Sequence, residues 1–205
     1  MTDGARARQR EQTRRALLRA GRRLFATRGY AAVGLAEIVH AAGVTKGALY
    51  HHFESKAELF RAVLEHVQQE VAQQVAATAD AEDDPWEQLT AGCRAFLTAS
   101  TDPDVQQIML IDGPAVLGWS DWRALDEAAS ARHLAEALAT LIEKGIITPQ
   151  PVEPLTHLLS GAMNEAALWL ARSTGPGDLE DTWIALSQML QALRLNSNGA
   201  TCRAS

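Results

Sequence analysis

The sequence predicts an all-α protein with two parts, an N-terminal three-helix helix-turn-helix domain and a larger C-terminal helical domain. Apolar residues recur at helical spacing along almost the whole chain, and most Gly and Pro residues fall between the periodic segments. Two short helical segments meet at a turn centred on Gly43, which is helix-turn-helix spacing. Residues 1–66 carry 12 Lys and Arg against 6 Asp and Glu, whereas residues 67–205 carry 7 against 19. A basic module therefore precedes an acidic one.

About nine helices are expected from the apolar periodicity and from the residues that start and stop helices. Thr45 is expected to cap the third helix, and Ser55 with Glu58 forms a capping box for the fourth. Asp84 before Pro85 is expected to cap the fifth. The glycines expected to end helices are Gly29, Gly43 and Gly145. The expected helices cover approximately residues 10–27, 35–42, 46–53, 55–78, 85–100, 103–113, 120–144, 154–172 and 178–195.

The bulk composition bounds the class of protein. The net charge of -6, taken alone, argues against nucleic acid as a partner, but the basic first third can bind a polyanion through counterion release. Cys93 and Cys202 show no Cys-x-x-Cys spacing, and no basic-then-apolar leader is present, so a cytoplasmic location is expected. No apolar run approaches the roughly 18 residues that span a bilayer, so no membrane partner is expected.

The third predicted helix carries side chains suited to DNA. Leu49 and Phe53 are four residues apart and can pack inward onto the first two helices. The residues left on the outward face are Lys46, Gly47, Tyr50 and His51. A helix presented in this way fits the major groove, with its N-terminal residues at the base edges.

Base reading and phosphate binding are expected from different residues of this segment. Lys46 can donate to guanine O6 or N7, Gly47 lets the backbone approach closely, and Ala48 can touch a thymine methyl group. Donors at a radius suited to phosphate oxygens are Tyr50, His51, His52 and Lys56. Lys56 also lies at the start of the fourth helix, where the helix dipole favours an anion.

The stretch from Ala16 to Leu64 resembles the DNA-binding domain of the TetR/AcrR family of regulators. The matching residues are Ala20, Leu24, Phe25, Gly29, Tyr30, Ile38, the run from Ala42 to Phe53, and the run from Ser55 to Leu59. The resemblance implies a dimer whose recognition helices enter successive major grooves of a palindromic operator. It also implies a C-terminal ligand-binding domain whose last two helices form the dimer interface.

The implied domains are a flexible basic tail (1–9), the helix-turn-helix domain (10–54), a connecting helix (55–78), a ligand-binding and dimerisation domain (79–195) and a flexible tail (196–205). One departure from the family pattern occurs where a Ser or Thr usually caps the second helix, because Gly34 stands there and has no side chain to contact a phosphate. Arg14 and Arg15 are expected to compensate. The expected DNA-binding set is Arg14, Arg15, Gly34, Thr45, Lys46, Gly47, Ala48, Tyr50, His51, His52 and Lys56.

The acidic domain is expected to dimerise and to bind an effector. The last two helices are too apolar for burial on one side, and their expected interface residues are Leu155, Leu159, Met163, Leu170, Leu179, Trp183, Leu186 and Leu190. A pocket between helices is expected for a small, mostly apolar effector. Its candidate residues are Phe96, Met109, Asp112, Trp119, Trp122, His133, Asn164, Glu165 and Trp169. Asn164 and Glu165 can equally face solvent, and each apolar candidate can equally be core.

The favoured hypothesis is a repressor that an effector releases from its operator. A constitutive DNA-binding regulator without a ligand is an alternative, and an all-helical enzyme is another. The enzyme would need a metal site at the carboxylates of residues 80–84 or at His51, His52 and His66. The carboxylates read more simply as a solvated linker, and adjacent histidines point about 100° apart around a helix. The expected partners are double-stranded DNA, a second copy and an effector, with no metal and no cofactor.

Overall fold

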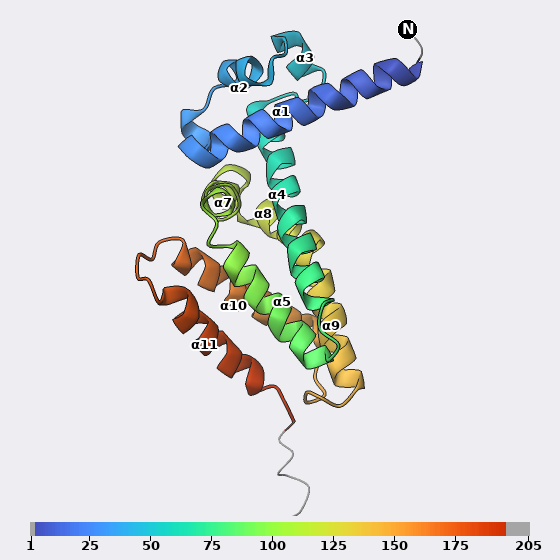
Figure 1. The fold of residues 1–205 in the computed structure, drawn as a ribbon, viewed down its shortest axis with the longest axis vertical. Helices are drawn as coiled ribbons and strands as arrows, with labels where there is room; N and C mark the ends of the chain where they lie inside the picture. Colours follow the sequence, from blue (N-terminus) through green and yellow to red (C-terminus); the bar gives the residue numbers. More distant parts are fainter. Residues whose placement is uncertain (1–2, 196–205) are drawn as a thin grey trace, which may run out of the picture. The chain divides into compact units, whose positions relative to one another are not determined.

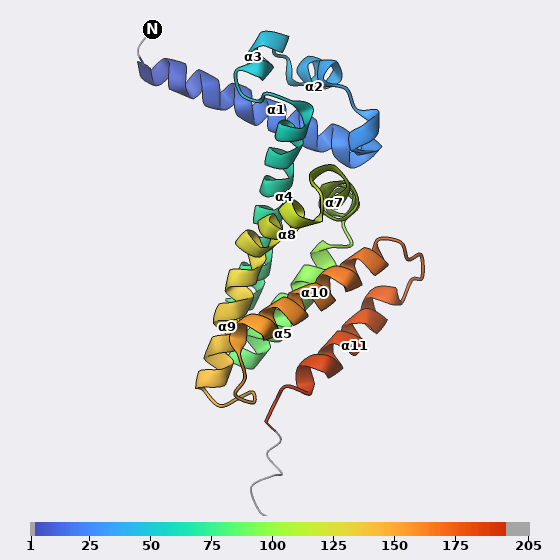
Figure 2. The same ribbon diagram turned by 180° about the vertical axis from the view of Figure 1, so that it is seen from behind.

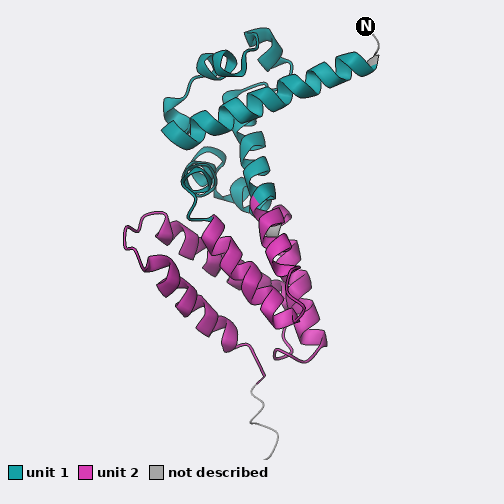
Figure 3. Ribbon diagram, viewed as in Figure 1, with its two compact units in different colours: residues 1–70, 100–126 teal, residues 71–99, 127–205 magenta. Residues whose placement is uncertain are grey.

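The computed structural model describes residues 3–195, apart from the side chains of Asp3 and Ser130, and is built from helices (Figure 1). Two compact units divide the chain, Met1–Glu70 with Ser100–Asp126, and Val71–Ala99 with Glu127–Ser205 (Figure 3). Unit 1 holds α1 (Asp3–Ala32), α2 (Leu35–Ala42), α3 (Lys46–Tyr50), the first part of α4 (Lys56–Ala79), α6 (Pro103–Val105), the π-helix η1 (Gln106–Asp112), α7 (Gly113–Leu117) and α8 (Trp119–Asp126). Unit 2 holds the rest of α4, α5 (Pro85–Ala99), the π-helix η2 (Glu127–Ala131), α9 (Arg132–Glu143), α10 (Val152–Leu170) and α11 (Asp178–Gln191).

The first three helices of unit 1 form the predicted helix-turn-helix. Helices α2 and α3 pack against α1 and against each other (Figure 1). Gly43 follows α2 with a φ of 66°, a left-handed conformation that glycine adopts without steric cost. Thr45 Oγ1 accepts a hydrogen bond from Ala48 N at 3.1 Å. The predicted caps on both sides of the turn are therefore confirmed, and fully buried Ile38 and Leu49 fill the space beneath it.

Helix α1 begins earlier than predicted and has a kink at the predicted Gly29. It begins at Asp3 rather than near Arg10, so a segment that was expected to be a tail is helical. Gly29 has the non-helical φ of 74° and ψ of 159° expected of the glycine that ends the first helix, and a short further helical stretch follows it to Ala32. Past the kink, Tyr30 N donates a hydrogen bond to Asp112 Oδ2 at 2.7 Å.

Helix α4 begins with the predicted capping box. Glu58 N donates to Ser55 Oγ at 3.1 Å, and the Glu58 carboxylate accepts from Glu54 N at 2.5 Å. The first bond satisfies a donor that the first turn of the helix leaves without a partner, and the second fixes the residue before the cap. The predicted apolar stripe is buried at Leu59, Val63, Val67 and Val71.

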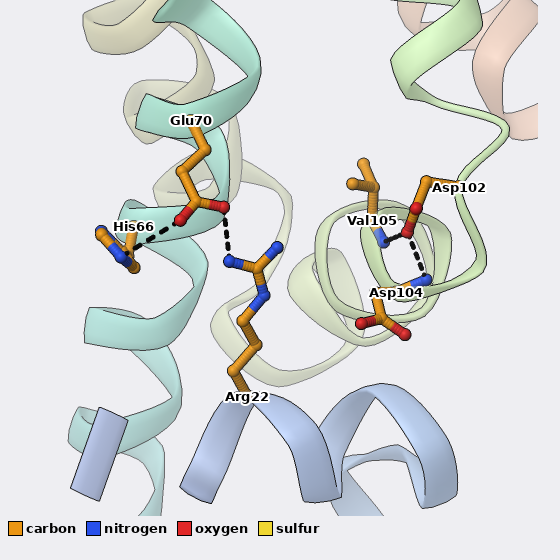
Figure 4. Close-up of polar contacts among 6 residues, drawn as sticks. All are labelled: Arg22, His66, Glu70, Asp102, Asp104 and Val105. Carbon is orange, nitrogen blue, oxygen red and sulfur yellow. Dashed lines mark hydrogen bonds and ion pairs between the residues drawn. The ribbon is translucent and has the colours of Figure 1, made fainter. Parts of the chain in front are cut away.

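The segment from α6 to α8 belongs to unit 1 and contacts α1 through α6 and η1. Asp102 Oδ1 caps it by accepting from Asp104 N and Val105 N at 2.8 and 3.2 Å (Figure 4). The single helix predicted over residues 103–113 is interrupted by η1, in which a π-helical turn disturbs the regular hydrogen-bond pattern. Fully buried Trp122 donates from Nε1 to Met109 O at 2.7 Å, so a side chain supports this irregular backbone.

Unit 2 is a helical bundle in which α5 contacts α9, α10 and α11, and α10 contacts α9 and α11 (Figure 2). Asp84 Oδ1 accepts from Trp86 N and Glu87 N at 2.8 and 3.1 Å, which confirms the predicted cap of α5. Gly145, with a φ of 64°, follows α9 as predicted. The predicted helix over residues 120–144 is instead α8, η2 and α9. The tail predicted for residues 196–205, including Cys202, lies outside the described residues.

Candidate nucleic-acid interface

Helix α3 presents polar groups outward above an apolar base. Leu49 and Phe53 are buried. The exposed residues of this segment are Lys46, Gly47, Tyr50 and His51. The Lys46 Nζ atom lies 5.9 Å from the centroid of the Tyr50 ring. A Cβ atom added at Gly47 would have its nearest neighbour, a hydroxyl oxygen, 4.0 Å away. A side chain at this position would not be crowded within the fold. The absence of one therefore leaves the backbone of α3 accessible from outside.

Lys56 is held at the surface by an aromatic cluster. Its Nζ atom lies 4.0 Å from the centroid of the Tyr30 ring, a distance suited to a cation–π contact. The Tyr30 ring packs against Phe25 and Phe60 at centroid distances of 5.7 and 5.1 Å. Burial raises the pKa of the Tyr30 hydroxyl, which stays neutral. The cluster therefore positions one cation soon after the recognition helix in the chain.

A cavity of about 440 Å³ lies between the start of α1 and the recognition segment. It is lined by Gln9, Arg10, Thr13, Ala48, His51 and His52. Burial lowers the pKa of His52, and the positive charges of Arg10, Arg14 and His51 lower it further against the opposing charge of Glu11. The imidazole is therefore neutral at pH 7. The cavity combines a fixed positive charge with a base that can accept a proton.

Two predicted basic residues of α1 occupy different surroundings. The Arg14 guanidinium carbon lies 5.8 Å from the centroid of the Phe53 ring, which places Arg14 beside the recognition segment. Arg15 Nε pairs with Glu11 Oε1 at 2.7 Å, and both side chains are exposed. Gly34 caps α2 without a side-chain hydrogen bond, as its sequence position predicted. Arg14 is thus the better placed of the two to replace the contact missing at Gly34.

Ion pairs connect α1 to α4 within unit 1 (Figure 4). The Arg22 guanidinium on α1 pairs with the Glu70 carboxylate on α4. The other Glu70 oxygen lies 3.3 Å from His66 Nε2. Arg61 Nη1 lies 3.3 Å from Asp121 Oδ2 on α8. Such partly exposed pairs contribute at most about 1 kcal/mol each, so their main effect is to orient α4 against α1 and α8.

Both parts of the chain match families of bacterial regulators. Residues 17–63 match the family described as bacterial regulatory proteins, tetR family, and residues 86–193 match the tetracyclin repressor-like C-terminal domain. The chain belongs to the TetR family. Members of this family are transcriptional regulators and not enzymes, so the hypothesis of an all-helical enzyme is wrong.

Several known proteins are similar to this TetR-family chain. A TetR-family regulator from Pectobacterium atrosepticum is 32% identical, with a TM-score of 0.79 and coverage of 96% of this chain and 99% of that chain. TtgR from Pseudomonas putida is 40% identical over 36% of this chain and 35% of TtgR, so the match spans about a third of that relative. The Tn10 TetC protein from Escherichia coli is 24% identical over 86% of this chain and 89% of TetC. RolR in complex with resorcinol shares the fold, with 23% identity, a TM-score of 0.70 and coverage of 89% of each chain.

Between residues 3 and 195 no group of three or more His, Cys, Asp or Glu side chains is arranged to hold a metal ion. Over the same range, none of the helices is both long and apolar enough to cross a membrane.

Four of the predicted effector residues lie in unit 1. Met109 and Trp122 are buried and are joined by the indole hydrogen bond described above. Trp119 is 62% exposed, and its ring centroid lies 5.0 Å from that of Trp122. The Asp112 carboxylate, which was expected to face a ligand, accepts the hydrogen bond from Tyr30 N. Asp112 therefore has a structural partner within the DNA-binding unit.

The other five predicted effector residues lie in unit 2. Phe96 and Asn164 are buried, whereas Glu165, Trp169 and His133 are exposed, the last of them beside Glu136. The suggested pair of Asn164 and Glu165 is therefore split between the interior and the surface. Asn164 continues a buried polar row on α10 whose members are spaced by four residues, namely Thr156, Ser160 and Asn164. Burial raises the pKa of the Cys93 thiol on α5 to about 12, which makes it an inert core residue.

Most residues predicted at the dimer interface are packed inside the chain itself. The buried members are Leu155, Leu159, Met163, Leu170, Leu186 and Leu190, whereas Leu179 and Trp183 are partly exposed. These six side chains expose at most 9% of their surface and so have little area to offer a second copy. The large apolar side chains that α10 and α11 do expose are Leu158, Trp169, Ile184 and Met189.

Sequence reasoning missed two sets of residues in unit 1. Arg10 lines the cavity beside the recognition segment, and the spacing of Arg6, Arg10 and Arg14 at four-residue intervals was a signal that they share a helix face. Gln68 is buried at 3% exposure, and its Nε2 atom has no hydrogen-bond partner among the described residues. Nothing in the sequence indicates that Gln68 is buried, because Gln68 is a polar residue beside the apolar stripe of α4 and not part of it.

Proposed function

We propose that this TetR-family chain is a repressor that binds a palindromic operator as a homodimer and is released by a small, mostly apolar effector. The observation that carries the DNA-binding part is the outward face of α3, where Lys46, Gly47 and Tyr50 are exposed above buried Leu49. A short helix exposed in this way can enter the major groove with Lys46 at the base edges. The operator of a bacterial regulator lies in the cytoplasm, and the proposal places the protein there.

The proposed dimer uses the exposed apolar side chains of the last two helices. Leu158 and Trp169 are 72% and 50% exposed. They are eleven residues apart on α10, and eleven steps of about 100° bring them back to nearly the same face. Ile184 and Met189 add apolar surface from α11. Exposed apolar side chains on helices that contact each other support association with a second copy.

The proposed effector binds where a buried polar group has no partner. A buried amide donor without an acceptor costs about 1–3 kcal/mol, and a ligand oxygen placed at Gln68 Nε2 would recover that energy. RolR, which has the same fold, is known in complex with resorcinol, a small aromatic molecule. These two facts support an effector with an apolar body and a polar oxygen.

The DNA-binding proposal is tested by fluorescence anisotropy on a duplex taken from upstream of the gene. Tyr50→Ala and Lys56→Ala are each expected to weaken binding about tenfold on this duplex and on a scrambled one, because they remove phosphate contacts. Lys46→Ala is expected to reduce the difference in affinity between the two duplexes. Lys144→Ala, which removes an exposed charge from the acidic domain, is the control and should bind as the wild type does.

Two results would contradict this division of labour. Binding of the wild-type protein that does not weaken as salt is raised would remove the DNA-binding proposal itself. Equal loss of sequence preference in Lys46→Ala, Tyr50→Ala and Lys56→Ala would show that base reading is not concentrated at the start of α3.

A further inference from the structure

An arginine stripe runs along the first half of α1 towards the recognition segment. Arg6, Arg10 and Arg14 are spaced by four residues on one continuous helix, so their side chains share a face. Arg14 lies beside Phe53 and Arg10 lines the cavity. Arg6 is exposed one turn closer to the N-terminus. The stripe therefore leads away from α3 along α1.

The cavity between α1 and the recognition segment has the chemistry of an anion site. The residues with hydrogen-bond donors among those that line it are Gln9, Arg10, His51 and His52. Thr13 Oγ1 donates to Gln9 O at 3.0 Å, so the hydroxyl proton is already used within the helix. The nearby carboxylate of Glu11 is paired with Arg15 at 2.7 Å. The volume of about 440 Å³ is ample for one phosphate group with bridging waters.

We infer that this cavity binds a phosphate of the DNA backbone and that the Arg6, Arg10 and Arg14 stripe extends the DNA interface beyond the helix-turn-helix. The inference rests on the proposed binding of α3 in the major groove, because the phosphates that flank the groove then lie beside the recognition segment. Arg10 supplies the permanent charge, and His52 supplies a second donor. The start of α1 is thereby part of the interface and contributes affinity without reading bases.

Proton uptake accompanies the binding of this phosphate. The groups that face His52 are Arg10, Glu11 and Arg14 from α1 and His51 from the recognition segment, and burial with the three positive charges keeps the pKa of His52 low in the free protein. A bound phosphate raises that pKa, because it stabilises the imidazolium. DNA affinity therefore rises as the pH falls from above the pKa of the bound form towards the pKa of the free form.

The first test compares the salt dependence of Arg10→Gln with that of Arg19→Gln. Arg19 is exposed on the same helix but nine residues away, which places it on roughly the opposite face. Arg10→Gln is expected to bind a mixed-sequence duplex about tenfold more weakly. Its slope of log affinity against log salt should be shallower by about 0.9, whereas Arg19→Gln keeps the wild-type slope. An unchanged slope in Arg10→Gln overturns the inference.

The second test measures duplex binding between pH 6 and pH 8. The wild-type protein is expected to bind about threefold more tightly at the lower pH through His52. His52→Gln should lose that dependence, while His66→Gln, on the surface of α4, should keep it. A pH dependence that survives in His52→Gln overturns the role of His52.

These tests separate the inference from the function on which it rests. If Arg10→Gln and His52→Gln behave as the wild type does while Tyr50→Ala and Lys56→Ala bind weakly, the cavity is not a DNA site but the DNA-binding proposal stands. The last experiment measures the thermal shift that inorganic phosphate causes. A thermal shift with phosphate that is lost in Arg10→Gln, together with an unchanged DNA slope, would identify a small-anion site and overturn the inference.

Discussion

The recognition segment of unit 1 and the interior of unit 2 depend on the fold in different ways. Residues 45–51 lie consecutively in the chain, and one short helix with its caps is enough to direct their side chains outward. The buried polar row of α10 and the apolar core around it depend on which helices pack together. The role of a contiguous segment can thus be predicted from its own residues. The contacts inside a helical bundle cannot, because they depend on which helices pack together.

The first prediction compares the same substitution in the two units. In Gly113→Ala a new Cβ would lie 2.8 Å from Trp122 Cδ1 and 3.2 Å from Ile108 O, and overpacking of this kind destabilises by about 1–3 kcal/mol. Gly161 lies inside α10 with no atom within 4 Å of the position of a Cβ. Gly161→Ala is therefore expected to stabilise the protein by about 0.5–1 kcal/mol.

Thermal unfolding of the two variants measures this difference. For a chain of this size, about 1 kcal/mol corresponds to a change of about 2–4 °C in Tm. Gly113→Ala should lower Tm and Gly161→Ala should raise it. A wild-type Tm for Gly113→Ala would show that the indole of Trp122 moves freely, and the close packing of α7 against α8 would not be a constraint on the fold.

Local hydrogen bonds explain which parts of the fold could be predicted. Thr45, Glu58 and Asp84 were identified as capping residues because each partner lies within a few residues in the chain. The hydrogen bond to Asp112 was not predicted, because its partner, Tyr30 N, is 82 residues away. The π-helical turns of η1 and η2 were missed because no residue type marks them.

Helical spacing shows that a face is apolar but not what covers it. Leu159 and Leu190 were expected to meet a second copy, yet they are buried within their own chain. Leu158, which neighbours one of them in sequence, is exposed instead. The exposure of Lys46, Gly47, Tyr50 and His51 was easier to predict, because the spacing of one short helix determines which of its side chains face outward. Arg10 was the exception, since its place beside His52 depends on where α1 begins.

The second prediction concerns the hydrogen bond from Tyr30 N to Asp112. Asp112→Ala leaves this partly buried donor without an acceptor and is expected to destabilise the protein by about 1–2 kcal/mol. Asp112→Asn keeps an oxygen at the same position, and its loss of stability should be less than half of that caused by Asp112→Ala. Chemical denaturation followed by circular dichroism measures both variants. If Asp112 served the effector instead, as its sequence position suggested, both substitutions would leave the stability of the free protein unchanged.

The smallest expected effect is an increase in stability, in contrast to the loss expected for Asp112→Ala. It distinguishes a ligand-binding residue from a core residue. Gln68→Leu replaces a buried amide that has an unpartnered donor with an apolar side chain of similar size, and should stabilise the free protein by about 1 kcal/mol. The same change should weaken release from DNA by an effector, because the ligand loses its donor. Gln73→Leu, at an exposed position of α4, controls for the change in helix propensity. A lower Tm for Gln68→Leu would mean that the amide is already satisfied in the free protein, and Gln68 would then have no energetic reason to bind a ligand.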